Sequence, residues 1–172
     1  DSGAFHAIME KMTTSAIDYL NYQIDQGVQA IQIFDSWVGC LSVSDYRNHV
    51  FDHSKKLIDS ISGKVPIIHF GTGNPSLLPL MTEAGGDVMA LDWRAPLKES
   101  WDLLACKAVQ GNMDPIALFG SVDSVRETAE SILEEVGGRP GHIFNLGHGI
   151  LPETPVENVK ALVEFVQGYE IS

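Results

Sequence analysis

The short segment NLGHGI, residues 145–150, places a histidine between two glycines directly after a run of apolar residues. Glycine allows the backbone on either side of His148 to approach a ligand closely. An imidazole can donate hydrogen bonds to a carboxylate, and its charge changes near neutral pH. The same pattern fits a loop histidine without a role, so the residues alone leave both interpretations open.

Ser36 has a similar position at the end of IFDSW, residues 33–37. Its hydroxyl is a candidate donor to a ligand, although serines at such places more often cap a helix. No acidic or basic residue stands at a fixed spacing that would make Ser36 a nucleophile. The sequence therefore predicts no catalytic triad around it.

The segment HFGTGNP, residues 69–75, begins like a dinucleotide-binding loop. Gly71 and Gly73 follow a strand-like run, and Asp92 comes about 20 residues later, as that fingerprint requires. Ser76 stands where the third glycine belongs, and Pro75 stiffens the turn. Two glycines at such a corner more often form a simple tight turn, so no nucleotide cofactor is predicted.

Metal ligation is the next chemistry to consider. Catalytic zinc takes about three N, S or O ligands in a tetrahedral array. No recognisable ligand spacing relates the candidates, which are His69, His142, His148, Asp92, Cys40 and Cys106. His6, His49 and His53 are predicted as ordinary helix-surface residues. The sequence therefore predicts no metal site.

The elements that must position these residues alternate regularly along the chain. Short apolar, β-rich runs predict strands over residues 30–34, 65–70, 87–92, 108–112 and 142–146. Helices are predicted over residues 4–26, 45–61 and 121–136, and after residues 75, 96 and 155. The first helix has one apolar stripe, formed by Phe5, Ile8, Met9, Met12, Ala16, Leu20 and Ile24. In the last helix, Thr154 as N-cap, Pro155 and Glu157 predict a capping box.

Apolar strands that alternate with helices predict a parallel α/β sheet. Polar residues follow every predicted strand, namely Asp35 and Ser36, residues 71–74, Asp92, Asn112 and Asp114, and His148. All strand ends converge on one face in a (β/α)₈ TIM barrel, whereas in an open sheet they meet at a switch point alone. The barrel is favoured, and since it typically needs about 250 residues, three strands must come from elsewhere.

Composition narrows the class of protein. The 172 residues are 44% hydrophobic and carry a formal charge of −12, which argues against nucleic-acid and membrane partners. No apolar run approaches the roughly 20 residues of a membrane span. Cys40 and Cys106 form no CxxC motif and are predicted as reduced thiols. The chain shows no export signal at its start, so a cytoplasmic location is expected.

Four segments resemble the uroporphyrinogen decarboxylase family in its bacterial form. They are QIFDSWVGCLS (residues 32–42), ALDWR (90–94), QGNMDP (110–115) and FNLGHGILPETPVENV (144–159). The last segment is long and specific, and the match runs in order along essentially the whole chain. The resemblance implies that residues 1–172 form the C-terminal half of a single barrel domain and supply about five βα units.

The resemblance also implies a function. The family removes the four acetate carboxylates of uroporphyrinogen III to give coproporphyrinogen III in haem biosynthesis, without a cofactor and as a homodimer. Ser36 and His148 correspond to substrate-binding positions of the family. The family's catalytic aspartate, its arginine-rich motif and a substrate-contacting tyrosine belong to the first half, so no catalytic residue is expected in this chain.

Two other interpretations fit parts of the sequence. Cobalamin-dependent methyltransferases of the same superfamily carry H-x-C after the fifth strand and a further late cysteine, whereas here Phe70 and Gly71 follow His69 and the late position reads GHG. Without those thiolates the decarboxylase is favoured. The other interpretation is a half-barrel fragment that is not catalytic by itself.

Overall fold

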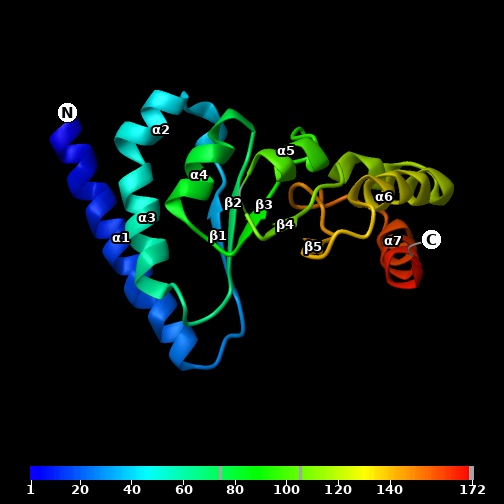
Figure 1. Ribbon diagram of the computed structural model, residues 1–172, viewed down its shortest axis with the longest axis horizontal. Helices are drawn as coiled ribbons and strands as arrows, with labels where there is room; N and C mark the ends of the chain where they lie inside the picture. The colour runs from blue at the N-terminus through cyan, green and yellow to red at the C-terminus, as the bar shows by residue number, and fades with distance from the viewer. Residues whose placement is uncertain (74, 105, 171–172) are drawn as a thin grey trace. The chain divides into compact units, whose positions relative to one another are not determined.

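The computed structural model describes residues 1–73, 75–104 and 106–170. Strands and helices alternate as predicted (Figure 1). The strands are β1 (Ile31–Asp35), β2 (Ile67–Gly71), β3 (Val88–Ala90), β4 (Ala108–Gln110) and β5 (His142–Ile143). The α-helices are α1 (Ser2–Asp25), α2 (Val43–His49), α3 (Phe51–Ile61), α4 (Leu78–Ala84), α5 (Leu97–Leu103), α6 (Val122–Val136) and α7 (Val156–Gly168). Three short 3-10 helices are η1 (Val38–Cys40), η2 (Pro75–Leu77) and η3 (Pro115–Phe119).

The strands form one sheet in the order β1-β2-β3-β4-β5. β1 pairs in parallel with β2, with Ile31 opposite Ile67. β4 pairs in parallel with β5, with Val109 opposite His142. Strands that neighbour each other in chain order and are separated by helices are what consecutive βα units produce. The prediction of a parallel α/β fold with about five such units is confirmed.

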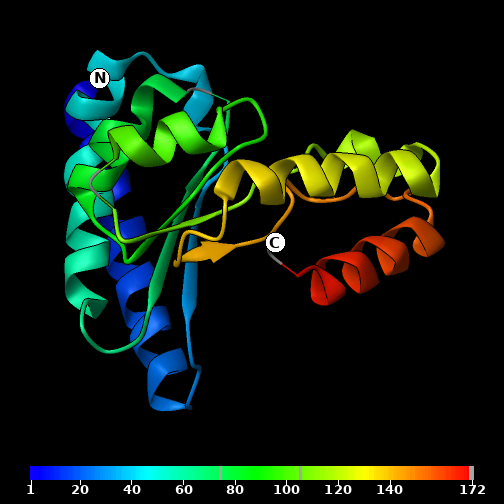
Figure 2. The same ribbon diagram turned by 45° about the vertical axis from the view of Figure 1, so that its right-hand side comes forward.

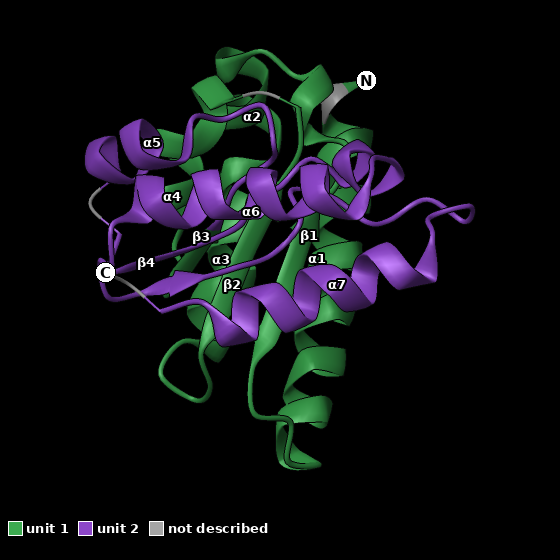
Figure 3. Ribbon diagram, turned by 90° about the vertical axis from the view of Figure 1, so that its right-hand side faces the viewer, with its two compact units in different colours: residues 1–89 green, residues 90–172 purple. Residues whose placement is uncertain are grey.

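The chain divides into two compact units, residues 1–89 and 90–172 (Figure 3). In unit 1, α1 and α3 lie side by side (Figure 1) and the side chains of Tyr46, Ile58 and Ile61 are buried. In unit 2, α6 and α7 lie side by side (Figure 2). They enclose an apolar cluster of Met113, Leu118, Val125, Ala129 and Leu162. Each unit therefore has a core of its own.

Local sequence signals explain several helix ends. Ser121 caps α6 by accepting a hydrogen bond from the backbone N–H of Ser124, and Gly137 ends this helix with a positive φ of 57°. The helix predicted over 45–61 is instead two helices, because the backbone turns at Val50 between α2 and α3. β5 is shorter than predicted and covers two residues.

The capping box predicted at the start of the last helix is wrong. The cap of α7 is Pro155, so the helix begins one residue later than the box requires. Thr154 is drawn into the preceding turn, where its backbone N–H donates to the carbonyl of Leu151. The side chain of Asn158 ties the helix down instead, because Nδ2 donates to the carbonyls of Leu118 and Gly120.

The predicted apolar stripe of α1 is also only partly buried. Phe5, Ile8 and Met12 are 42, 59 and 62% exposed, whereas Thr13 is buried. The helix turns the face with His6 and Thr13 toward α3, where His53 lies within 3.2 Å of His6 and 3.5 Å of Thr13. Apolar residues occur on more than one face of α1, and periodicity does not say which of them is covered.

Those contacts correct the prediction for the histidines of unit 1. His6 Nδ1 and His53 Nε2 are 3.2 Å apart, and the ring centroids of His6 and His49 are 5.7 Å apart. Phe5 packs edge-on against His49. The three histidines are therefore packed together between helices and are not isolated surface residues. Cys40 and Cys106 are free thiols, as predicted. No helix within the described ranges has the length and apolarity needed to span a membrane.

Candidate functional site

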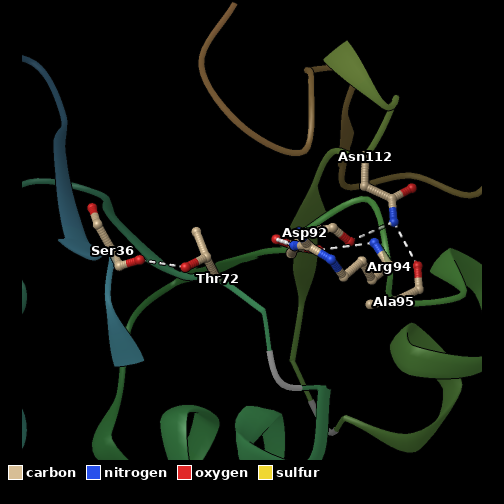
Figure 4. Close-up of polar contacts among 6 residues, drawn as sticks. All are labelled: Ser36, Thr72, Asp92, Arg94, Ala95 and Asn112. Carbon is tan, nitrogen blue, oxygen red and sulfur yellow. Dashed lines mark hydrogen bonds and ion pairs between the residues drawn. The ribbon is translucent and has the colours of Figure 1, made fainter. Parts of the chain in front are cut away.

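Ser36 follows β1 in the turn that leads to η1. The hydroxyl of Thr72, which follows β2, donates to the carbonyl of Ser36 (Figure 4). Gly39 belongs to η1, and a side chain there would overlap the backbone of Thr72. The cap of η1 is Trp37, so Ser36 does not cap the short helix that follows. Contacts with Thr72 therefore hold the turn in place. The side chain of Ser36 is half-buried and does not cap a helix.

Asp35, the last residue of β1, is held by a buried histidine. His69 Nε2 lies 3.2 Å from Asp35 Oδ2, and the Ser54 hydroxyl donates to the same carboxylate oxygen at 3.3 Å. His69 is fully buried. Burial first, and then the negative charge of Asp35, raise the pKa of the neighbouring Tyr46 phenol, so this phenol stays protonated.

The other nitrogen of His69 faces the carbonyls of Met81 at 3.2 Å and Gly85 at 3.3 Å. Carbonyl oxygens only accept, so Nδ1 carries a proton. His69 therefore joins β2 to α4 and to the carboxylate that precedes Ser36. This polar arrangement supports the turn at the carboxyl end of β1.

In unit 2, the loop between β3 and α5 carries the ALDWR segment. Asp92 is buried, and its Oδ1 accepts from the backbone N–H of Arg94 at 2.9 Å. Nη1 of Arg94 donates to Oδ1 at 3.1 Å and to Oδ2 at 2.8 Å (Figure 4). The guanidinium lies over the Trp93 ring, 3.7 Å from its centroid. The loop is therefore closed by a charged pair and a cation–π contact.

The end of β4 supports the same loop. Asn112 Nδ2 donates to the carbonyl of Asp92 at 3.0 Å and to that of Ala95 at 2.6 Å (Figure 4). His142 Nε2 lies 2.7 Å from the carbonyl of Gly111. Burial lowers the pKa of His142, so this imidazole is neutral near pH 7 and donates from Nε2. The side chains of Asn112 and His142 thus both bind backbone carbonyls and hold them in place.

His148 is exposed in the loop after β5. Its ring meets the Trp93 ring edge-on, with centroids 5.9 Å apart and planes at 90°. The preceding Gly147 is packed against Trp93, because a Cβ there would overlap Trp93 N and lie 2.8 Å from its Cα. The Gly147 N–H also donates to the carbonyl of Met113 at 2.7 Å. The glycine therefore fixes the place of His148 beside Trp93.

Other predicted strand-end residues have different roles. Asp114 caps η3 by accepting from the N–H of Ile116. A Cβ on Gly71 would lie 2.6 Å from Met81 Cε and 2.8 Å from Val38 Cγ1, so this glycine makes room for side chains. Asn74 lies outside the described residues. Across residues 1–73, 75–104 and 106–170, no three His, Cys, Asp or Glu side chains are grouped as metal ligands would be.

Sequence reasoning missed the roles of Trp93, Arg94 and Asn112 in unit 2, and of His69 in unit 1. The signal for Asn112 is its place as a polar residue directly after a strand. Trp93 and Arg94 lie in the ALDWR segment, which resembles the family. Which loop each side chain would contact was not visible in the local pattern.

Comparison with known proteins gives this geometry a context. The family described as uroporphyrinogen decarboxylase (URO-D) matches residues 1–169. The uroporphyrinogen decarboxylases of Koribacter versatilis and Carboxydothermus hydrogenoformans are 50% and 49% identical to the chain over 169 and 165 residues. These alignments cover 96% and 95% of this chain and 48% and 47% of the relatives, so the chain spans about half the length of the relatives it matches.

A solved structure is also similar. A methyltransferase from Methanosarcina mazei superposes with a TM-score of 0.78 at 25% identity, over 90% of this chain and 46% of that protein. The fold is therefore shared with a protein named as a methyltransferase, so the fold alone does not identify the function. Because the family match extends over nearly every residue, the chain belongs to the uroporphyrinogen decarboxylase family.

Proposed function

We propose that this chain is the C-terminal half of a uroporphyrinogen decarboxylase, a carboxy-lyase that acts on a tetrapyrrole. The observation that carries the proposal is identity of about 50% to curated enzymes of that name along almost the whole chain. The proposal includes a single barrel domain that contains residues 1–172, a cytoplasmic location and a homodimer. The fragment is expected to need the other half for activity.

The proposed reaction explains which residues this half would supply. Protonation of a pyrrole ring makes the ring an electron sink, so that an acetate arm can lose CO₂ without a cofactor. A carboxylate in the other half would stabilise the cation that develops on the pyrrole. In this half, Ser36 and His148 would donate hydrogen bonds to substrate carboxylates. Their positions after β1 and after β5 support this role, since the active sites of barrels lie at the carboxyl ends of strands.

The test uses the full product of the reading frame that encodes this chain. Incubation with uroporphyrinogen should yield products with progressively fewer carboxylates, from eight to four, resolved by chromatography of the oxidised porphyrins. Chelation should leave the rate unchanged, because the proposed chemistry uses no metal. Substrate that binds but keeps all eight carboxylates would overturn the proposal. Loss of activity on chelation would instead favour a metal-dependent activity.

Ser36→Ala should lower kcat/KM for uroporphyrinogen about ten- to a hundredfold, because a hydrogen bond to a charged group contributes roughly 1.5–3 kcal/mol. The backbone should be unaffected, since the Thr72 hydroxyl contacts the carbonyl of Ser36 and not its side chain. Ser44→Ala, in an exposed part of α2, is the matched control and should retain full activity. Complete loss of turnover in folded Ser36→Ala would make the hydroxyl a chemical participant.

A further inference from the structure

Arg94 is a solvent-exposed cation of unit 2 whose side chain is fixed by its neighbours. Nη1 of this guanidinium makes both of its hydrogen bonds to Asp92, and the backbone N–H of Arg94 binds the same carboxylate. The Trp93 ring supports the flat face of the guanidinium from 3.7 Å. A long, flexible side chain is therefore held in one position before any ligand arrives.

The two members of this ion pair differ in their exposure. The Asp92 side chain is 5% exposed, whereas the Arg94 side chain is 50% exposed. The negative charge is thus covered, and the positive group faces solvent. A guanidinium has five N–H donors, and in the described part of the chain its side-chain hydrogen bonds leave from Nη1. Nε and Nη2 therefore keep donors for a second carboxylate, which a guanidinium binds with two parallel bonds.

Trp93 joins Arg94 to His148. The indole contacts the guanidinium with its face and the imidazole edge-on, with 5.9 Å between the indole and imidazole centroids. Guanidinium, indole and imidazole thus form a continuous row of side chains on two loops of one unit. Two carboxylate-binding groups on either side of an aromatic ring suit a ligand that carries several carboxylates on flat rings.

We propose that Arg94 binds a substrate carboxylate, next to the carboxylate that His148 would hold. The proposal rests on the proposed function, and it makes unit 2 a source of positive charge for a polyanionic ligand in a chain whose net charge is −12. Asp92 and Trp93 act through Arg94 as positioning residues. The Asp92 carboxylate fixes the guanidinium, and Trp93 sets its separation from His148.

The same unit contains a matched control. Arg139 also donates from Nη1 to an aspartate, Asp102, at 2.8 Å, and its guanidinium lies 4.0 Å from the centroid of the Trp101 ring. Its side chain is 43% exposed, close to the value for Arg94. The Trp101 ring also has a histidine neighbour, His142, with 6.4 Å between the ring centroids, but His142 is half-buried and already donates to the carbonyl of Gly111, whereas His148 is exposed. Asp102 is itself 51% exposed. Arg139→Gln therefore removes the same groups without touching the proposed site.

The experiment measures binding of uroporphyrin, the oxidised octacarboxylate, to the full product of the reading frame by fluorescence titration. Arg94→Gln should weaken the Kd about ten- to a hundredfold, as expected for the loss of a charge-assisted hydrogen-bonded pair. Arg94→Lys should give an intermediate Kd, because the charge remains but the paired donors are lost. Arg139→Gln should stay within about twofold of wild type. The variant Asp92→Asn/Arg94→Gln removes both charges of the ion pair, and it should bind as weakly as Arg94→Gln.

The outcomes separate the two proposals. Wild-type affinity in Arg94→Gln, or an equal loss in Arg94→Gln and Arg139→Gln, overturns the role of Arg94. If the wild type binds uroporphyrin but does not decarboxylate uroporphyrinogen, the decarboxylase function is overturned, and the variant series still decides the role of Arg94. A wild type that does not bind the probe overturns both.

Discussion

His148→Ala should lower kcat/KM for uroporphyrinogen on the order of a hundredfold, measured with the full product of the reading frame. This variant would lose the hydrogen bond that the imidazole is proposed to donate to a substrate carboxylate. His148→Gln keeps a donor at similar reach and should retain much more activity. If both variants abolish turnover equally while substrate still binds, general acid catalysis by His148 is the better account. Unchanged kinetics in both would leave the histidine without a role.

Substitutions of the two glycines beside His148 test independently whether the position of this histidine matters, because they leave His148 itself unchanged. Gly147→Ala would place a Cβ against the backbone of Trp93, at 2.8 Å from its Cα, so the loop has to shift. Gly149→Ala introduces no such conflict, since nothing lies within 4 Å of its Cβ position. We expect Gly147→Ala to lower kcat/KM by more than tenfold and Gly149→Ala to leave it near wild type. Equal activities would show that the position of His148 beside Trp93 does not matter.

The sequence was sufficient for the order of the elements. Apolar β-rich runs identified all five strands, and Ser121 correctly marked the start of α6. These features depend on residues that are close in sequence, and the physical signals for them are local. The same holds for the positions of Ser36 and His148 directly after strands.

Contacts between distant segments were not predictable in this way. Asn112 was identified as a polar strand end, but its amide closes on the backbone 17 and 20 residues earlier. Arg94 stands two residues after Asp92, but the role proposed for it depends on the exposure of the two side chains, which the sequence does not give. The covered face of α1 was likewise set by packing against α3. These contacts and exposures are decided by tertiary structure, about which a local sequence pattern carries little information.

His69 shows the same limit and leads to the largest expected effect on stability. From the sequence it was a candidate metal ligand, whereas in the fold its two nitrogens contact Asp35 and the carbonyls of Met81 and Gly85. His69→Leu would leave the carbonyls of Met81 and Gly85 without the Nδ1–H donor and would remove the contact to Asp35, in a fully buried place. We expect the free energy of unfolding of unit 1 to fall by about 2–3 kcal/mol. The Asp35 side chain is 22% exposed, and water there reduces the penalty for leaving it unpaired.

Because the chain has two compact units, a single unfolding midpoint would combine the stabilities of both units. Amide hydrogen exchange in β1 and β2 reports on unit 1 alone and should accelerate in His69→Leu. A cycle with Asp35→Asn tests the pair, and the double variant should cost at least about 1 kcal/mol less than the two single variants together. Arg47→Gln, which removes the exposed Arg47–Glu83 ion pair of the same unit, should change stability by about 1 kcal/mol at most. Additive effects of His69→Leu and Asp35→Asn would mean that His69 stabilises the unit without coupling to Asp35, through its packing and its contacts with the carbonyls of Met81 and Gly85, and that the carboxylate before Ser36 is held by other groups.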